Sequence, residues 1–91
     1  MDLNFNKEGN EYVAEFEATG DFNLHVEKSK SGRLDIYQRT TQNGEYTSIE
    51  NLKYQYDKKV IDYDFVGCIY PKNIKIISRF EPTMAVVTFN A

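Results

Sequence analysis

The fold of this chain is decided by residues 33–50, which read RLDIYQRTTQNGEYTSIE. Two runs of alternating side chains flank the dipeptide Asn43-Gly44. This dipeptide favours a type I′ turn, because both central residues of that turn need a positive φ. The stretch therefore predicts a β-hairpin. With a two-residue loop, Gln38 would lie opposite Ile49 and Arg39 opposite Ser48.

Side chains alternate between the two faces of a strand, so the hairpin has a core face and an outer face. The core face carries Leu34, Ile36 and Ile49, and the outer face carries Tyr37, Arg39 and Tyr46. The simplest interpretation of the outer face is cross-strand packing, with the stem of Arg39 on a tyrosine ring. The alternative is a contact surface, because Tyr and Arg are enriched among the residues that dominate binding at interfaces.

Alternating apolar residues predict further strands along most of the chain. They occupy residues 11–19, 22–27, 51–57, 59–66 and 73–79. Residues 84–89 are apolar on both faces, which predicts a central strand or one covered by a partner. We expect one domain over residues 1–91: an antiparallel β-sandwich of about eight short strands, jelly-roll or immunoglobulin-like, with a small β-barrel as the alternative.

The charge balance limits the classes of partner. The chain has 11 Lys and Arg against 14 Asp and Glu, a net charge of −3. Nucleic acid is therefore not expected as a partner, because neutralising phosphates needs clustered cations. No apolar segment approaches the length of a membrane-spanning helix, and no signal peptide is recognisable. We expect no membrane binding, and a location in the cytoplasm or in a particle assembled there.

Residues that often carry chemistry have simpler structural interpretations here. The carboxylate pairs Glu15/Glu17 and Asp62/Asp64 fit solvated strand faces, since catalysis would need a cleft and a raised pKa. His25 is the only histidine and falls on a polar face, which is a poor metal signal. Cys68 is the only cysteine and fits a small buried residue. The sequence thus predicts no enzyme activity, no metal site and no cofactor.

A basic segment precedes the hairpin. Residues 28–33 are expected to form a flexible loop that carries Lys28, Lys30 and Arg33. Such a loop is able to hold an acidic partner or a phosphate, but the simpler interpretation is a solvated turn.

Several segments resemble the small all-β structural proteins of tailed bacteriophages and prophages. They are residues 19–26, the strand Ile36-Tyr37-Gln38-Arg39, the segment Gly44-Glu45-Tyr46-Thr47, and residues 70–76 followed by a closing strand. Similar strand and glycine-turn patterns occur in carbohydrate-binding modules and immunoglobulin-like domains. The phage resemblance implies a module that self-assembles or binds a capsid or tail through its surface, and it implies no catalytic residue.

Three functional hypotheses follow. The first is a structural or interaction protein that docks on a protein partner or associates with itself. The second is a carbohydrate-binding module using Tyr37, Tyr46 and Tyr54 or Tyr56, although the chain has no Trp, the strongest such platform. The third is a barrel that binds a small molecule or a nucleic acid. The contact residues expected for the first hypothesis are Tyr37, Arg39, Tyr46, Lys28, Lys30 and Arg33.

Overall fold

The computed structural model describes residues 1–40, 44–49, 58–67 and 70–89. These residues form eight strands and no helix. In chain order the strands are β1 (Asn6–Glu8), β2 (Glu11–Ala18), β3 (Phe22–Lys28), β4 (Leu34–Arg39), β5 (Thr47–Ser48), β6 (Val60–Phe65), β7 (Lys72–Ser78) and β8 (Pro82–Phe89). Their pairing is antiparallel throughout.

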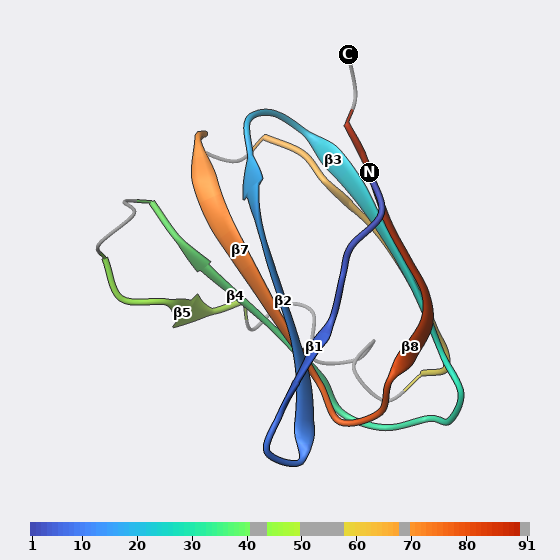
Figure 1. Cartoon of the computed structure of the whole chain (residues 1–91). Helices are drawn as coiled ribbons and strands as arrows, with labels where there is room; N and C mark the ends of the chain where they lie inside the picture. The colour runs from blue at the N-terminus through green and yellow to red at the C-terminus, as the bar shows by residue number, and fades with distance from the viewer. Residues whose placement is uncertain (41–43, 50–57, 68–69, 90–91) are drawn as a thin grey trace.

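The strands form two separate sheets that face each other, as Figure 1 shows. One sheet has five strands in the order β1-β2-β7-β4-β5, and the other has three in the order β6-β3-β8. The predicted all-β sandwich is therefore confirmed. The alternative, a closed barrel, is excluded because the strands belong to two sheets rather than one continuous ring.

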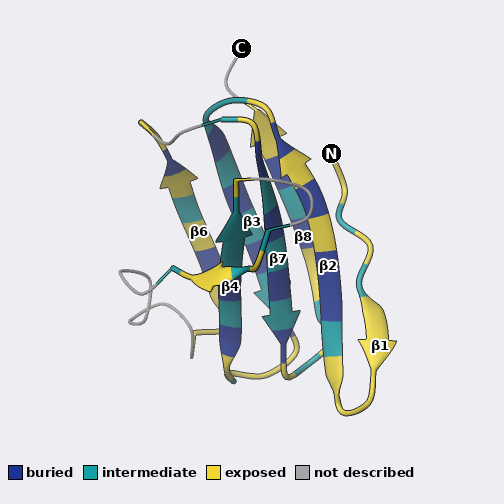
Figure 2. Ribbon diagram, turned by 90° about the vertical axis from the view of Figure 1, so that its left-hand side faces the viewer, coloured by how far each residue is buried: buried dark blue, intermediate teal, exposed yellow. Residues whose placement is uncertain are grey.

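The core lies between the sheets and follows from the alternation of the sequence. Along β3, Phe22, Leu24 and Val26 are fully buried, and the residues between them are only partly covered. Figure 2 shows the same banding on β2 and β7. The ring of Phe22 stacks on Phe65 at 4.6 Å between centroids and meets Phe16 edge-on at 5.4 Å. Burying a ring of this size contributes about 1.5–3 kcal/mol.

The five-stranded sheet is built around β7, which pairs with β2 on one side and β4 on the other. Ile74, Ile76 and Ser78 point inward and are fully buried. Pro71 lies just before the strand, so its missing N–H removes nothing from the ladder.

Of the two alternatives predicted for residues 84–89, the central strand is wrong, and coverage by a partner stays a prediction. β8 stands at the end of its sheet, and among the strands of the described residues it pairs with β3 alone. Its other edge is bound by the N-terminal segment, where Leu3 N donates to Ala85 O at 2.9 Å and Val87 N donates to Met1 O at 2.8 Å. The two-sided apolar pattern has a different cause: Ala85 and Val87 enter the core, whereas Met84 stays 49% exposed.

The register of the hairpin also differs from the prediction. Gln38 lies opposite Thr47, and Tyr37 lies opposite Ser48, a shift of two residues. This register brings Ile49 beside the buried Ile36, where Ile49 N donates to Ile36 O at 3.0 Å. Apolar pairing therefore outweighs the preference of the turn. A shift of two residues leaves every side chain on its predicted face.

Some predictions fall outside the described residues. These are the turn at Asn43, the strand over residues 51–57 with Tyr54 and Tyr56, and the interpretation of Cys68.

Candidate functional site

The outer face of the five-stranded sheet carries most of the predicted contact residues. Figure 2 looks onto this sheet, with β4, β7, β2 and β1 side by side. Across it, Glu15 of β2 lies opposite Lys75 of β7, which lies opposite Tyr37 of β4. In the row above, Glu17 lies opposite Asn73, which lies opposite Arg39. The registers thus bring residues from distant parts of the chain into a single surface.

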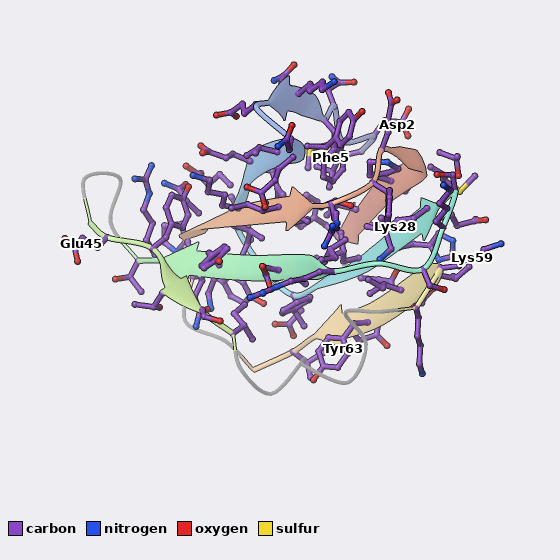
Figure 3. The ribbon with its side chains drawn as sticks, turned by 90° about the horizontal axis from the view of Figure 1, so that it is seen from below. Asp2, Phe5, Lys28, Glu45, Lys59 and Tyr63 are labelled. Atoms are coloured by element: carbon purple, nitrogen blue, oxygen red, sulfur yellow. The ribbon has the colours of Figure 1, made fainter. Side chains whose placement is uncertain are left out.

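The hairpin of β4 and β5 forms a wall at one side of this face. Figure 3 shows Glu45 at the outer end of the hairpin, away from both sheets. Within the hairpin, the guanidinium carbon of Arg39 lies 4.4 Å from the ring centroid of Tyr46. Lys75 Nζ lies 5.5 Å from the same centroid. The predicted packing of arginine on tyrosine is therefore present, and it holds Tyr46 over the sheet.

The Arg39–Tyr46 contact leaves polar atoms without partners. Arg39 Nε and the Tyr46 hydroxyl are both buried, and neither makes a hydrogen bond of regular geometry within the described residues, although the Glu15 carboxylate lies near enough to the hydroxyl to help raise its pKa. Burial is the main factor that raises the pKa of Tyr46; the nearby charge of Glu15 raises it further, while Arg39 acts in the opposite direction. An unsatisfied buried polar group costs about 1–3 kcal/mol, so the hairpin contact is not optimised for stability alone.

Hollows lie at both ends of this face. One of about 260 Å³ opens beneath the hairpin wall and is lined by Glu15, Phe16, Glu17, Arg39, Tyr46 and Asn73. The other, of about 420 Å³, lies at the opposite end of the sheet and is lined by Asn10, Glu11, Arg33, Asp35, Ile77 and Arg79. Both combine carboxylates with cations, which suits complementary polar contacts with a protein surface.

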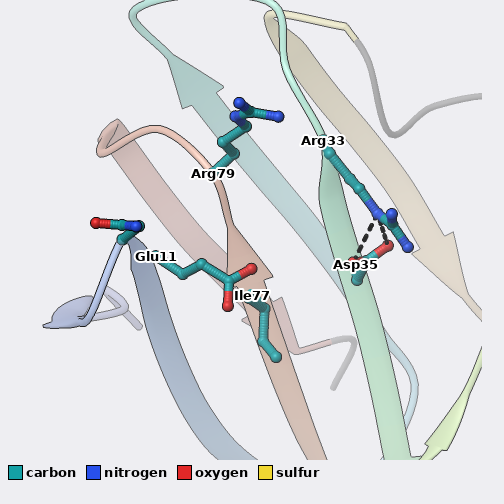
Figure 4. Close-up of a pocket in the computed structure, with 6 residues that line it drawn as sticks. Glu11, Arg33, Asp35, Ile77 and Arg79 are labelled. Carbon is teal, nitrogen blue, oxygen red and sulfur yellow. Dashed lines mark hydrogen bonds and ion pairs between the residues drawn. The ribbon is translucent and has the colours of Figure 1, made fainter.

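Figure 4 shows the larger hollow, with Ile77 between the side chains of Glu11 and Asp35. Arg33 Nε donates to both carboxylate oxygens of Asp35, at 3.0 and 3.1 Å. This pairing raises the pKa of Arg33. The guanidinium of Arg79 points away from that of Arg33, so the two arginines do not form a single anion-binding group.

The predicted basic loop does not converge into one site. Lys28 is the last residue of β3 rather than a loop residue, and its side chain is only 4% exposed. Its ammonium group donates to the carbonyl of Gly32, which explains how the long side chain is buried. Lys30 lies over the Phe80 ring, 5.8 Å from its centroid. Of Lys28, Lys30 and Arg33, the three basic residues predicted for this loop, Arg33 is the one that lies on the face that carries Tyr37, Arg39 and Tyr46.

A second polar cluster lies on the outer face of the three-stranded sheet. His25 Nδ1 lies 2.8 Å from Asp62 Oδ2, and its Nε2 lies 2.9 Å from Glu27 Oε2. The Asn23 amide donates to Asp62 at 2.7 Å and to Asp64 at 2.9 Å. Glu27 and Asp62 raise the pKa of His25, and Asn23 and His25 lower that of Asp62.

Sequence reasoning placed His25 correctly on a polar face but missed both of its carboxylate partners. Glu27 is two residues away on the same strand, a spacing that the sequence displays. Asp62 comes from β6, and only the pairing of β3 with β6 reveals it. Among the described residues, no group of three or more His, Cys, Asp or Glu side chains is placed to hold a metal ion.

Comparison with protein-family models, with curated proteins and with solved structures finds no match to this chain. The described part of the chain also contains no helix with the length and apolar character needed to cross a membrane.

Proposed function

We propose that this chain is a non-enzymatic interaction module that binds a protein partner, or a second copy of itself, through the outer face of its five-stranded sheet. The observation that carries the proposal is the convergence of Arg33, Tyr37, Arg39 and Tyr46 on that one face. Tyr and Arg supply large contact area together with directed hydrogen bonds, so they dominate many protein interfaces.

The hairpin wall supports this proposal. It gives an otherwise open sheet a recess beneath Tyr46, which suits an inserted side chain of a partner. The unpaired Arg39 Nε and Tyr46 hydroxyl lie at this wall, and a small hairpin movement would present them to partner acceptors. Glu15 of β2 lies opposite Lys75 of β7, so partner charges of both signs find a counterpart on this face.

We further propose that the module belongs to a larger assembly. The resemblance to structural proteins of tailed phages favours a virion or assembly component, present in the cytoplasm during assembly or in the finished particle. A surface of paired charges with one aromatic recess is consistent with that role, because it gives specificity in docking.

Glycan binding remains the alternative, resting on the half-buried Tyr37. The environment of Tyr46 argues against it at that position. Arg39 and Lys75 both lie over the ring, and a sugar that stacked there would have to displace a cation.

The proposal is tested with Arg39→Glu and Tyr46→Ala. Light scattering over a concentration series measures self-association, and cross-linking with mass spectrometry identifies a partner in native particles or lysate. Both variants should weaken association by about tenfold or more, the loss typical of interface hot spots. Lys7→Glu is the matched control, because Lys7 is exposed but lies off the proposed surface. It lies opposite the inward-facing Tyr12, so its side chain is on the other side of the sheet. Unchanged association in both variants would show that the hairpin is scaffold only.

A further inference from the structure

The two sheets have four edges, and they are protected to different extents. The five-stranded sheet ends in β1 and β5, strands of three and two residues that offer little backbone for pairing. On the three-stranded sheet, the edge at β8 is bound by the N-terminal segment. The remaining edge, β6, is six residues long, and no strand in the described part of the chain pairs with its outer side.

The pairing of β6 with β3 identifies the backbone groups on that outer side. Lys28 N donates to Lys59 O at 2.8 Å, so Lys28 and Lys59 form a hydrogen-bonded pair. In an antiparallel ladder such pairs alternate with non-hydrogen-bonded ones. The register then makes Val26/Ile61 and Leu24/Tyr63 hydrogen-bonded pairs.

The backbone N–H and C=O groups of the alternate residues of β6 therefore point away from β3. These residues are Val60, Asp62 and Asp64.

The opposite edge of the same sheet supports this assignment. The residues of β3 that do not bond to β6 bond to β8, so the same alternation continues into β8. The residues of β8 whose backbone groups point outward therefore include Ala85 and Val87. These are the residues that bond to Leu3 and Met1. The N-terminal segment also contributes Leu3 and Phe5, which pack against the core. One margin of the sandwich is thus closed by an added strand-like segment with apolar side chains.

The margin at β6 has the same chemical character. Its inward-facing residues are Ile61, Tyr63 and Phe65, and Tyr63 is only partly buried. Figure 3 shows Tyr63 and Phe5 at opposite margins of the molecule. The outward-facing side chains of β6 include Asp62 and Asp64. Their carboxylates accept hydrogen bonds from the Asn23 amide and remain exposed. The edge therefore alternates carboxylate and apolar positions.

We propose that the edge of β6 receives an extended segment of a partner protein by strand addition. The segment carries Lys or Arg opposite Asp62 and Asp64, and apolar residues at the positions between them, which cover Tyr63. Main-chain hydrogen bonds to Val60, Asp62 and Asp64 supply affinity, and the alternating side chains supply specificity.

Charge selects this occupant over a second copy of the chain. Two copies of β6 related by a two-fold axis pair antiparallel, with equivalent faces aligned. In the two registers that overlap the β6 strands most, Asp62 would then lie opposite its own counterpart or opposite Asp64 of the copy. Like charges directly opposite each other destabilise a ladder, whereas opposite charges stabilise it. The two aspartates thus disfavour self-pairing in these registers and favour a basic strand.

The test uses a seven-residue synthetic peptide, acetylated and amidated, with lysine at positions 3 and 5 and valine or threonine elsewhere. The control peptide has glutamate at positions 3 and 5. Isothermal titration against the full chain should show the lysine peptide binding about tenfold more tightly, because two cross-strand ion pairs replace two repulsions. Hydrogen exchange should slow specifically at the amides of Asp62 and Asp64 when the lysine peptide is bound.

A charge-reversed variant tests the same ion pairs from the side of the protein. Asp62→Lys with Asp64→Lys should reverse the preference toward the glutamate peptide, with circular dichroism confirming that the variant folds. Equal binding of both peptides to the unmodified chain overturns the proposal. Slow exchange at Asp62 and Asp64 without peptide also overturns it, because the edge would already be paired. So does self-association that depends on Asp62, which would assign the edge to a second copy.

Discussion

Tyr46 combines a favourable ring environment with an unfavourable hydroxyl environment. Its ring contacts Arg39 and Lys75, while its buried hydroxyl has no partner among the described residues. Tyr46→Phe keeps the ring and removes the unsatisfied group, so the free energy of unfolding should stay the same or rise by about 1 kcal/mol. Urea denaturation measures this, with Tyr46→Leu as the control that also removes the cation–π contacts. A loss of stability in Tyr46→Phe would mean that the hydroxyl has a partner in solution.

His25 gives the stability a dependence on pH. Its pKa is raised above 6.5 by Glu27 and Asp62, so its stabilising contribution is complete below about pH 6.5 and is lost as pH rises through the folded-state pKa. The pKa of Asp62 is lowered below 3.8, so its contribution is present above about pH 3.8 and is lost as pH falls through the folded-state value. The cluster therefore stabilises most between these limits.

We expect the free energy of unfolding to be about 0.5 kcal/mol higher at pH 5.5 than at pH 8, a small effect because these side chains are exposed to solvent. Denaturation at both pH values measures it, and nuclear magnetic resonance titration of His25 measures the pKa directly. His25→Gln should abolish the difference. A His25 pKa at or below 6.5 would contradict the pairing of His25 with Glu27 and Asp62.

The sequence predicted the side of the strand on which most residues lie, but not their partners. Alternation correctly placed Phe22 inward and His25 outward. It gave no sign that Lys28 would be buried, because that depends on the Gly32 carbonyl meeting its ammonium group. Contacts that are set by tertiary geometry leave little trace in local composition.

At the scale of elements, strand existence was predictable and strand neighbours were not. Local alternation marks β2, β3, β6 and β7 because each buries one face. The apolar pattern of β8 suggested a central position, yet its second partner is the irregular segment at the N-terminus. The hairpin register followed the core position of Ile49 rather than the turn dipeptide.

The N-terminal segment offers a direct test of how an edge is stabilised. Leu3→Pro removes the N–H that bonds to Ala85 O, and should lower the free energy of unfolding by about 2 kcal/mol. Leu3→Ala removes the packing but keeps the donor, so comparison of the two in urea denaturation separates the two contributions. If Leu3→Pro matched Leu3→Ala, the backbone bond would contribute nothing measurable.

At the scale of the whole molecule, the sandwich was predictable from many short strands, but its topology was not. The central strand β7 pairs with β2 and β4, which are both far from it in sequence. Such pairings are selected by the shared core and not by local signals. The candidate surfaces have the same origin: Lys75 joins Glu15 and Tyr37 only through those registers.

The two proposed surfaces belong to different sheets, which predicts that they act independently. The hairpin wall belongs to the five-stranded sheet, and β6 is the edge of the other. Mutations at distant sites without shared partners have additive effects. Arg39→Glu should therefore leave binding of the lysine peptide within about twofold of the unmodified chain. Asp62→Lys with Asp64→Lys should likewise leave association through the hairpin unchanged. Titration and light scattering on the single-surface and combined variants measure both effects.

If Arg39→Glu weakened peptide binding by about tenfold or more, with the fold intact, the two sheets would have to be coupled through the core rather than acting as separate docking surfaces.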